Sequence, residues 1–289
     1  MKSSYYKYFA ALLLFGSNGI VASNINLPSY EIVLLRLLLG SLFLITVFTV
    51  SRQRFTFYRN KHTCLYLFIS ASAMGASWML LYEAYQQVGI SIASLAYYCG
   101  PVIVMILSPF LFRETLTWPK IAGFLTVLAG MCLVNLQALD EGKTIWGLFC
   151  GLMSAFMYAL MVTANKKAKP ESGLENSLLQ LVIGSFIVVA FVSMQKNFVL
   201  SLTTIDWIPV LLLGLLNTGI GCYLYFSSIT DLPVQTVAIC GYLEPLSAVV
   251  FSVLFLHEVL LPLQMLGAVL IPVSYTHSEP TRLQLISYA

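Results

Sequence analysis

The sequence predicts an all-α integral membrane protein made of two related halves. Three observations lead to this fold class: a strongly apolar composition, a series of long apolar runs, and an internal repeat. The 289 residues are 59% hydrophobic and only 9% charged, with a mean hydropathy of +0.86, whereas a soluble domain carries about 25% charged residues. Because so few charges cannot cover a water-facing surface, we expect the lipid bilayer to surround most of the chain.

Ten apolar runs follow one another along the chain, separated by short connections rich in turn-forming residues. Most of them approach the ~20 residues that a helix needs to cross ~30 Å of hydrocarbon. A backbone in lipid must satisfy its own hydrogen bonds, so each run is expected to be a helix. We therefore predict about ten transmembrane helices, of which the last is too short to span. The runs cover residues 5–23, 29–50, 64–85, 90–112, 118–136, 144–165, 174–194, 207–229, 233–256 and 260–273.

The internal repeat relates the two halves by a constant shift of 144 residues. Under this shift Pro101 falls on Pro245, and Glu114 falls on Glu258. A register held over so long a span indicates duplication, which has to be settled before single residues are interpreted. We therefore expect one five-helix repeat in residues 1–139 and a second in residues 140–273.

The C-terminal tail, residues 274–289, departs from the repeat, which stops matching after Ile271. It is either a polar extension of the last run or a segment foreign to the fold, and we favour the second interpretation.

Lysine and arginine predict the orientation, because they stay preferentially in cytoplasmic loops. Assigned to alternate sides of ten helices, they gather on the side that holds both termini, so both termini are expected in the cytoplasm. Each half then has an odd number of helices, and the second half enters the membrane upside down relative to the first. Such inverted repeats are a recurrent plan of secondary transporters, with substrate bound near the midplane. The residues on the basic side are Lys2, Lys7, Arg52, Arg54, Arg59, Lys61, Arg113, Lys120, Lys166, Lys167, Lys169 and Arg282.

Several residues carry a resemblance to a known family. These residues are Arg36 and Gly40 in the second run, the Glu244-Pro245 pair, and Glu114 and Glu258 at the ends of the fourth and ninth runs. On these residues and on its paired five-helix halves, the chain resembles the EamA-type transporters of the drug/metabolite transporter (DMT) superfamily. The resemblance covers roughly residues 5–271. It implies a multi-pass carrier of the bacterial inner membrane, often an exporter of amino acids or related small metabolites, with a central cavity between the halves.

Arg36 is a charged group at membrane depth, where a charge costs at least ~2.5 kcal/mol and tends to be functional. A guanidinium is a planar fork that matches a carboxylate, so Arg36 is a candidate substrate-binding residue. The alternative is a structural arginine that joins the second helix to its neighbours. The repeat equivalent of Arg36 is the neutral Gln180, so the position tolerates a merely polar side chain, which favours the structural interpretation slightly.

Glu244 is the second such group, immediately before Pro245. One interpretation makes it a proton-coupling or substrate-amine group; the other makes it a polar neighbour of the carbonyl that Pro245 leaves unpaired. Its repeat equivalent is Gly100, before Pro101, so the predicted kink is shared by both halves and the charge is not. Gly100, Pro101 and Pro245 are therefore expected to let the fourth and ninth helices bend as gates while the halves rock in alternating access.

Aromatic and amide side chains complete the predicted binding site. Trp78, Tyr82, Tyr98 and Tyr242 are candidates for a cavity wall, since a tyrosine offers an amphipathic surface and one hydroxyl. The alternative is a belt at the membrane interface. Asn18 is a further polar candidate, which could equally bridge helices by hydrogen bonds.

Other functional classes have weak support in the sequence. The chain holds no HExxH, GxSxG or paired DDxxD pattern, and its three histidines are not at metal spacing. We therefore expect no catalytic residues, metal or cofactor, although a membrane-embedded enzyme stays a rival, as does a carrier of drugs or other metabolites. The basic residues lie in short clusters, so no nucleic-acid partner is expected. The predicted partners are a small-molecule substrate and the lipid bilayer, with the oligomeric state left open and a monomer possible.

Overall fold

The computed structural model describes residues 2–115 except 26 and 89, residues 145–194 and 207–256, and several isolated positions between 117 and 129. Within these ranges the regular structure is entirely helical, without a β-strand. The first half contains α1 (Lys2–Gly16), α2 (Asn18–Ser23), α3 (Ser29–Val50), the short 3₁₀-helix η1 (Phe57–Arg59), α4 (Lys61–Val88), α5 (Ile90–Tyr97) and α6 (Gly100–Phe112). The second half contains α8 (Ile145–Ala168), α9 (Gly173–Ser193), α10 (Trp207–Leu211), the π-helix η4 (Leu212–Ile220), α11 (Gly221–Ile229), α12 (Val234–Cys240) and α13 (Leu243–Leu256).

Six helical stretches among the described residues are long and apolar enough to cross a membrane. The shortest has 21 residues, about 31 Å at 1.5 Å per residue, which matches the hydrocarbon thickness. The predicted count of about ten is not reached within the described residues; the run 260–273, most of 118–136 and the tail 274–289 lie outside them. The six stretches are Tyr30–Val50, Lys61–Val88, Ile145–Ala168, Gly173–Ser193, Trp207–Ile229 and Val234–Phe255.

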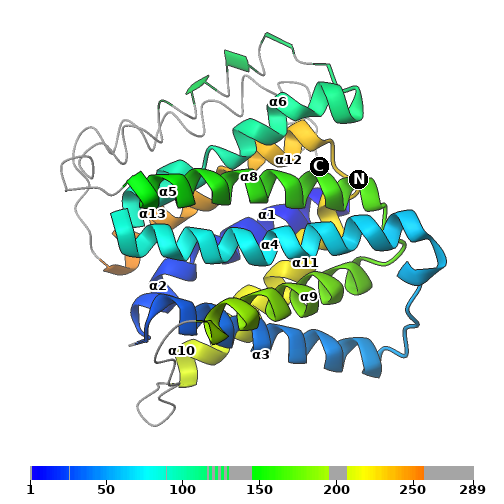
Figure 1. Cartoon of the computed structure of the whole chain (residues 1–289), viewed down its shortest axis with the longest axis horizontal. Helices are drawn as coiled ribbons and strands as arrows, with labels where there is room; N and C mark the ends of the chain where they lie inside the picture. The colour runs from blue at the N-terminus through cyan, green and yellow to red at the C-terminus, as the bar shows by residue number, and fades with distance from the viewer. Residues whose placement is uncertain are drawn as a thin grey trace.

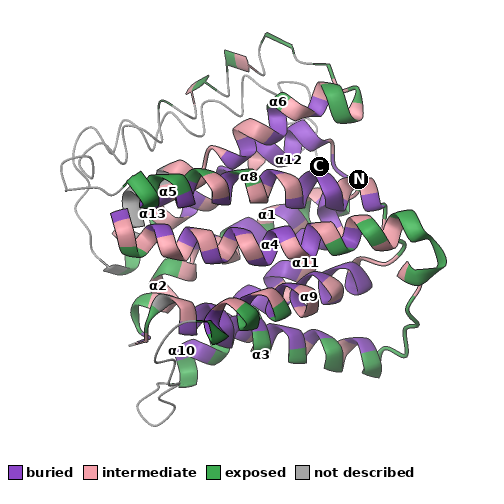
Figure 2. Ribbon diagram, in the orientation of Figure 1, coloured by how far each residue is buried: buried purple, intermediate pink, exposed green. Residues whose placement is uncertain are grey.

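The long helices pack side by side as a bundle. α4 packs against α8 and α9, and α3 packs against α9 and η4, as Figure 1 shows. Figure 2 shows buried positions on the sides where helices meet and exposed positions on the outer sides. Many outer positions hold large apolar side chains, such as Phe68, Phe110 and Phe186. This apolar exterior is what a bilayer-embedded bundle requires, since lipid takes the place of water there.

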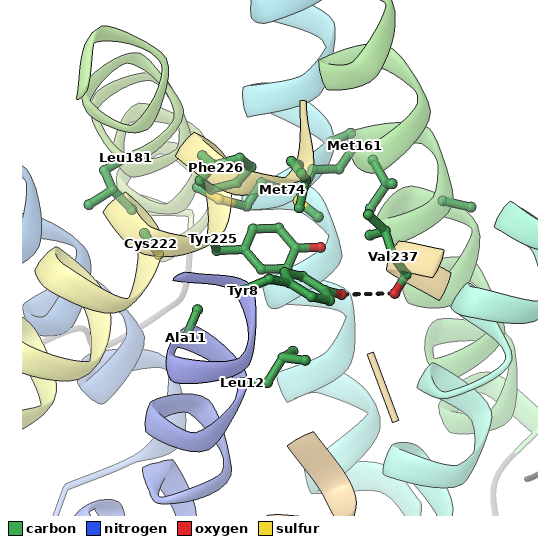
Figure 3. Close-up of a cluster of buried hydrophobic side chains, with 14 of the residues drawn as sticks. Tyr8, Ala11, Leu12, Met74, Met161, Leu181, Cys222, Tyr225, Phe226 and Val237 are labelled. Atoms are coloured by element: carbon green, nitrogen blue, oxygen red, sulfur yellow. Dashed lines mark hydrogen bonds between the residues drawn. The ribbon is translucent and has the colours of Figure 1, made fainter. Parts of the chain in front are cut away.

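The largest buried cluster joins the two halves. Tyr8 of α1 is fully buried, with its ring 5.6 Å from the ring of Tyr225 in α11. Its hydroxyl donates a hydrogen bond of 2.8 Å to the carbonyl oxygen of Val237 in α12, as Figure 3 shows. The first helix is therefore anchored within the second half, and the two halves share one core.

Three of the predicted helices are broken into separate segments. The first breaks at Ser17, the fourth at residues 98–99 and the ninth at residues 241–242. The prediction of kinks at Gly100-Pro101 and Glu244-Pro245 is thus corrected in detail: each break precedes the proline, which lies in the first turn of the next helix. The reason is that backbone N–H groups of a first turn have no partner within the helix, so proline is tolerated there.

Glycine allows α4 and α9 to approach closely. A Cβ added to Gly75 would lie 2.8 Å from the carbonyl oxygen of Gly184 and 3.0 Å from the Cβ of Ile187. Such small-residue contacts drive helix packing in lipid, where no hydrophobic force acts between helices. This seam has no space for a larger side chain.

We expect Gly75→Leu to destabilise the protein by about 1–3 kcal/mol, because the added side chain must push the two helices apart. The matched control is Gly19→Leu in α2, where an added Cβ would meet no atom within 4 Å. Thermal unfolding in detergent would compare the two variants. Equal unfolding temperatures for both would contradict the tight packing of α4 on α9.

Candidate functional site

Arg36 lies about two turns into α3 and is only 7% exposed. Its Nε donates a hydrogen bond of 2.9 Å to Oγ1 of Thr218. The central carbon of the guanidinium lies 4.5 Å from the ring centre of Trp78 in α4, which is a favourable cation–π distance. Within the described part of the chain, the two terminal guanidinium nitrogens have no hydrogen-bond partner. Arg36 is therefore held through its Nε, which binds Thr218, and through the face of its guanidinium, which lies over Trp78. The two terminal nitrogens are available to bind another group.

The π-helix η4 determines where Thr218 lies. Thr218 donates its own proton to the carbonyl oxygen of Leu213 at 2.8 Å, so its oxygen accepts from Arg36. A Cβ added to Gly40 would lie 2.9 Å from the methyl group of Thr218, and one added to Gly214 would lie 2.6 Å from the Cβ of Leu39. Two glycines thus bring α3 and η4 together around Arg36. π-Helical turns are frequent at functional sites.

Glu244 is half-buried in the first turn of α13. Its charge is close enough to Arg36 to interact electrostatically. The two groups form no ion pair, because no guanidinium nitrogen of Arg36 lies within 4.0 Å of a carboxylate oxygen of Glu244. Glu244 also interacts electrostatically with Tyr97, Tyr98 and Tyr158. Two opposite charges therefore face one region of the bundle, separated and surrounded by tyrosines.

The tyrosines connect the helix breaks of the two halves. Tyr98 lies at the break of the fourth helix and Tyr242 at the break of the ninth. The hydroxyl of Tyr242 donates a hydrogen bond of 2.8 Å to the carbonyl oxygen of Tyr98. These two residues are equivalent under the 144-residue shift, so the contact joins repeat-related positions. Tyr97 continues the aromatic group, with its ring 5.5 Å from that of Tyr158.

The predicted wall residues of α4 face the same region. Trp78, Tyr82 and Tyr98 are half-buried and pack against the main buried cluster, whereas belt residues would lie on the outer surface of the bundle. The Tyr82 ring lies 5.2 Å from that of Tyr85, and Tyr85 in turn interacts electrostatically with both Arg36 and Glu244. Ring, cation–π and hydrogen-bond contacts, together with electrostatic interactions, thus associate Arg36, Trp78, Tyr82, Tyr98, Tyr242 and Glu244, and their roles remain predictions.

Asn18 has a different environment. It begins α2 after the break at Ser17, and its Oδ1 accepts a hydrogen bond of 3.0 Å from Nδ2 of Asn217 in η4. The same amide nitrogen donates a hydrogen bond of 2.9 Å to the carbonyl oxygen of Leu14, which also accepts from Ser17 at the break. This geometry supports the interpretation of Asn18 as a bridge between helices.

Acidic and basic side chains join the ends of helices at one end of the bundle. Glu114 accepts hydrogen bonds from the backbone N–H groups of Val234 and Gln235, at 2.8 and 3.0 Å, and so caps the start of α12. The Gln235 side chain donates to Ser108 of α6 at 2.9 Å. Lys166 donates to three carbonyl groups at residues 229, 230 and 232. Glu114 thus anchors a helix end, and Glu258 lies outside the described residues.

Sequence reasoning missed several of these residues. Thr218 and Tyr158 were not predicted to surround the two charges. The Asn-Thr-Gly-Ile-Gly segment at 217–221 was the available signal for Thr218, because closely spaced glycines inside an apolar run indicate close approach of another backbone. Among the described residues, no group of three or more His, Cys, Asp or Glu is arranged to hold a metal ion.

A family model, described as the EamA-like transporter family, matches residues 3–136 and again residues 145–276. The chain belongs to the EamA-like transporter family. The resemblance noted in the sequence is thereby confirmed, and the protein is a multi-pass membrane protein of a transporter family. The two matched segments cover both halves and contain Arg36, Trp78 and Glu244.

Curated relatives of this EamA-like protein are distant but extensive. It is 27% identical over 256 residues to "Uncharacterized transporter YxxF" of Bacillus subtilis, covering 86% of this chain and 80% of that protein. It is 27% identical over 234 residues to "Threonine/homoserine exporter RhtA" of Escherichia coli, covering 81% and 76%. It is 20% identical over 202 residues to "Biotin transporter" of Salmonella typhimurium, covering 68% and 67%. Since the relatives' names include different substrates, family membership alone does not define what this chain carries.

A solved crystal structure has the same fold. It superposes with a TM-score of 0.80, covering 97% of this chain and 98% of that one, at 17% sequence identity. The helical arrangement is therefore one that an experimentally determined protein adopts.

Proposed function

We propose that the protein is a secondary-active carrier that exports amino acids or related small metabolites across the bacterial inner membrane by alternating access. The observation that carries the proposal is the pair of opposite charges, Arg36 and Glu244, which face one interior region without forming an ion pair. A zwitterion has the complementary charges: its carboxylate fits the guanidinium fork, and its ammonium group or a coupling proton fits Glu244. The similarity to an exporter of threonine and homoserine supports this class of substrate.

The proposed architecture is ten helices in two inverted repeats, residues 1–139 and 140–273, with both termini in the cytoplasm. All the described lysines and arginines except Arg36 lie near one end of the bundle. Hydrogen bonds connect that end: Ser4 to Asp231, and Thr63 to the carbonyl oxygen of Ala168. The preference of Lys and Arg for the cytoplasm then makes this the cytoplasmic end. The hydrogen bond between the equivalent Tyr98 and Tyr242 supports a pseudo-two-fold axis passing between them.

The gates of the proposed cycle are the broken helices. At the end that we assign to the cytoplasm, α6 packs against α12, held by the Glu114 cap and the Ser108–Gln235 hydrogen bond. In an inverted repeat the equivalent pair at the other end is α5 and α13, which make no comparable contact between described residues. This difference supports a state closed to the cytoplasm. Gly100, Pro101 and Pro245, which follow the breaks, would allow α6 and α13 to reorient in the opposite state.

Cross-linking α6 to α12 should stop transport. We expect a Ser108→Cys/Gln235→Cys protein, with the native cysteines replaced, to lose more than ~90% of its transport when a short thiol cross-linker joins the pair, because the gate can no longer open. A cleavable linker should restore transport when it is cut, and each single cysteine variant treated alike serves as the control. Full transport by the cross-linked protein would contradict this gate.

A second candidate is a carrier of drugs or other metabolites, as predicted for the superfamily. The similarity to a biotin transporter favours this candidate. The stacked Trp78 and the neighbouring tyrosines would offer an aromatic surface to a ring-containing solute.

Purified protein in liposomes, tested with a panel of amino acids with and without a pH gradient, separates these functions. The proposal predicts accumulation of at least one neutral amino acid against its concentration gradient when the pH gradient is present. A pore cannot accumulate solute, so equilibration without accumulation would contradict a secondary-active carrier. Accumulation of other metabolites without any amino acid would favour the second candidate.

A further inference from the structure

A pocket of about 350 Å³ opens at the end of the bundle where the basic connections gather. It lies between the connection from α3 to α4, which includes η1, and the connection from α8 to α9. Arg36 is 14 residues before the last residue of α3, about 21 Å along a helix axis. The pocket is therefore separate from the region around Arg36 and Glu244, and the proposed function does not use it.

Basic side chains line the pocket. Lys167, Lys169 and His62 all contribute to its wall. Tyr66 lies beside two of them: the His62 ring is 4.5 Å from the Tyr66 ring, and Nζ of Lys167 is 6.0 Å from the ring centre. A cation beside an aromatic face is attracted to the ring and limited in the positions it occupies. Lys167 and His62 are therefore both placed against the ring of Tyr66.

Lys169 occupies a backbone conformation that suits glycine better. Its φ is 48°, in the left-handed region that L-residues rarely adopt. Helices commonly end with glycine in this conformation, because glycine has no Cβ to clash. A lysine at this position is less favourable for the backbone than glycine, and it adds an ammonium group to the pocket.

The wall also holds two acidic residues, and one of them is already occupied. Glu175 accepts hydrogen bonds from the backbone N–H groups of Thr56 and Phe57, at 2.6 and 3.0 Å, and from the Thr56 hydroxyl. Glu171 is exposed. The adjoining connection adds further exposed cations, Arg52, Arg54, Arg59 and Lys61. The local charge is thus positive, which favours an anionic ligand.

Apolar side chains next to the pocket indicate where the rest of the ligand lies. Phe55 and Tyr58 are exposed and flank the wall residues Thr56 and Phe57 in the connection. Aromatic side chains of this kind sit at the level of lipid head groups, and exposed apolar residues of a membrane helix contact acyl chains. An anion with an apolar tail fits both surfaces, whereas a free phosphate would use the pocket alone.

We propose that this pocket binds the phosphate group of an anionic phospholipid from the adjacent leaflet. Lys167, Lys169 and His62 contact the phosphate, while the acyl chains pass Phe55 and Tyr58 towards the hydrocarbon. Basic pockets between transmembrane helices are suited to anionic head groups, because the attraction of the membrane surface adds to the local contacts.

The test measures lipid retained by the intact protein. The protein, purified from nanodiscs of mixed phosphatidylglycerol and phosphatidylcholine, would be examined by native mass spectrometry. We expect Lys167→Ala/Lys169→Ala to retain about 10-fold less phosphatidylglycerol than the parent, and Lys167→Arg/Lys169→Arg to retain most of it. The matched control is Lys2→Ala/Lys7→Ala, which removes two charges from the same end outside the pocket and should retain lipid as the parent does.

Two further arms identify the source of the phosphate. Excess inorganic phosphate should not displace the retained lipid; displacement at millimolar concentration would overturn the lipid assignment in favour of a free phosphate. Unchanged thermal unfolding would show that the double alanine variant is folded. If it unfolds early, Lys169→Gly, which suits the left-handed backbone, replaces it and should still lose lipid. Equal phosphatidylglycerol retention by the pocket variants and the Lys2→Ala/Lys7→Ala control would overturn the proposal.

Discussion

Arg36→Gln is expected to fold normally and to weaken substrate binding by on the order of 100-fold, about 2.7 kcal/mol. Glutamine is the residue at the equivalent position of the second half, Gln180, where it is fully buried, so the fold accommodates a neutral amide in such a place. The substitution removes the charge that would meet a substrate carboxylate. Arg36→Lys should give an intermediate loss, because an ammonium keeps the charge and loses the fork.

Substrate binding by purified Arg36→Gln protein would be measured by calorimetry, together with thermal unfolding. Arg54→Ala, which removes an exposed arginine, is the control and should bind as the parent does. The structural interpretation of Arg36 predicts the reverse pattern: early unfolding with unchanged affinity in the fraction that remains folded. That pattern would contradict a binding role.

Glu244→Gln is expected to abolish accumulation driven by a pH gradient while leaving exchange of substrate across the membrane largely intact. Glutamine has nearly the same size as glutamate and retains a hydrogen-bonding oxygen, but it cannot take up and release a proton. If Glu244 couples proton movement to substrate movement, the variant still binds and exchanges substrate and no longer uses the gradient.

Both activities can be compared in liposomes, with uptake under a pH gradient in one assay and exchange of labelled for unlabelled substrate in the other. Glu83→Gln is the control, since Glu83 is also half-buried but accepts hydrogen bonds from Gln87 and Trp146, at 3.2 and 3.3 Å. Gradient-driven accumulation that survives Glu244→Gln would leave the residue with its alternative role beside Pro245.

Hydropathy predicted the long helices well and their internal breaks poorly. The runs 29–50, 144–165 and 174–194 agree closely with α3, α8 and α9, because bilayer thickness imposes a length that sequence alone reveals. The breaks at residues 98–99 and 241–242 depend on which carbonyl groups find partners on neighbouring helices. Proline marks the vicinity of a break, and it does not say whether the helix bends or ends.

The candidate site was predicted residue by residue, and its connections were not. Charge at membrane depth was enough to select Arg36 and Glu244, since the cost of burial makes such residues rare. Their environment required the tertiary structure: Thr218 reaches Arg36 through a π-helix that no periodicity reveals. Asn18 was also selected as a polar residue within an apolar run, but in the structure it accepts a hydrogen bond from Asn217. The sequence pattern is the same for a residue that binds substrate and for one that joins two helices.

The central claim, that Arg36 holds the carboxylate of a transported amino acid, is tested most directly by comparing each amino acid with its carboxamide. Liposomes containing the parent protein would be loaded with unlabelled substrate, and uptake of the labelled amino acid or its amide would be followed. The account predicts exchange of the amino acid at least ten times faster than that of the amide, with the difference lost in Arg36→Gln. Equal exchange of acid and amide by the parent protein would contradict it.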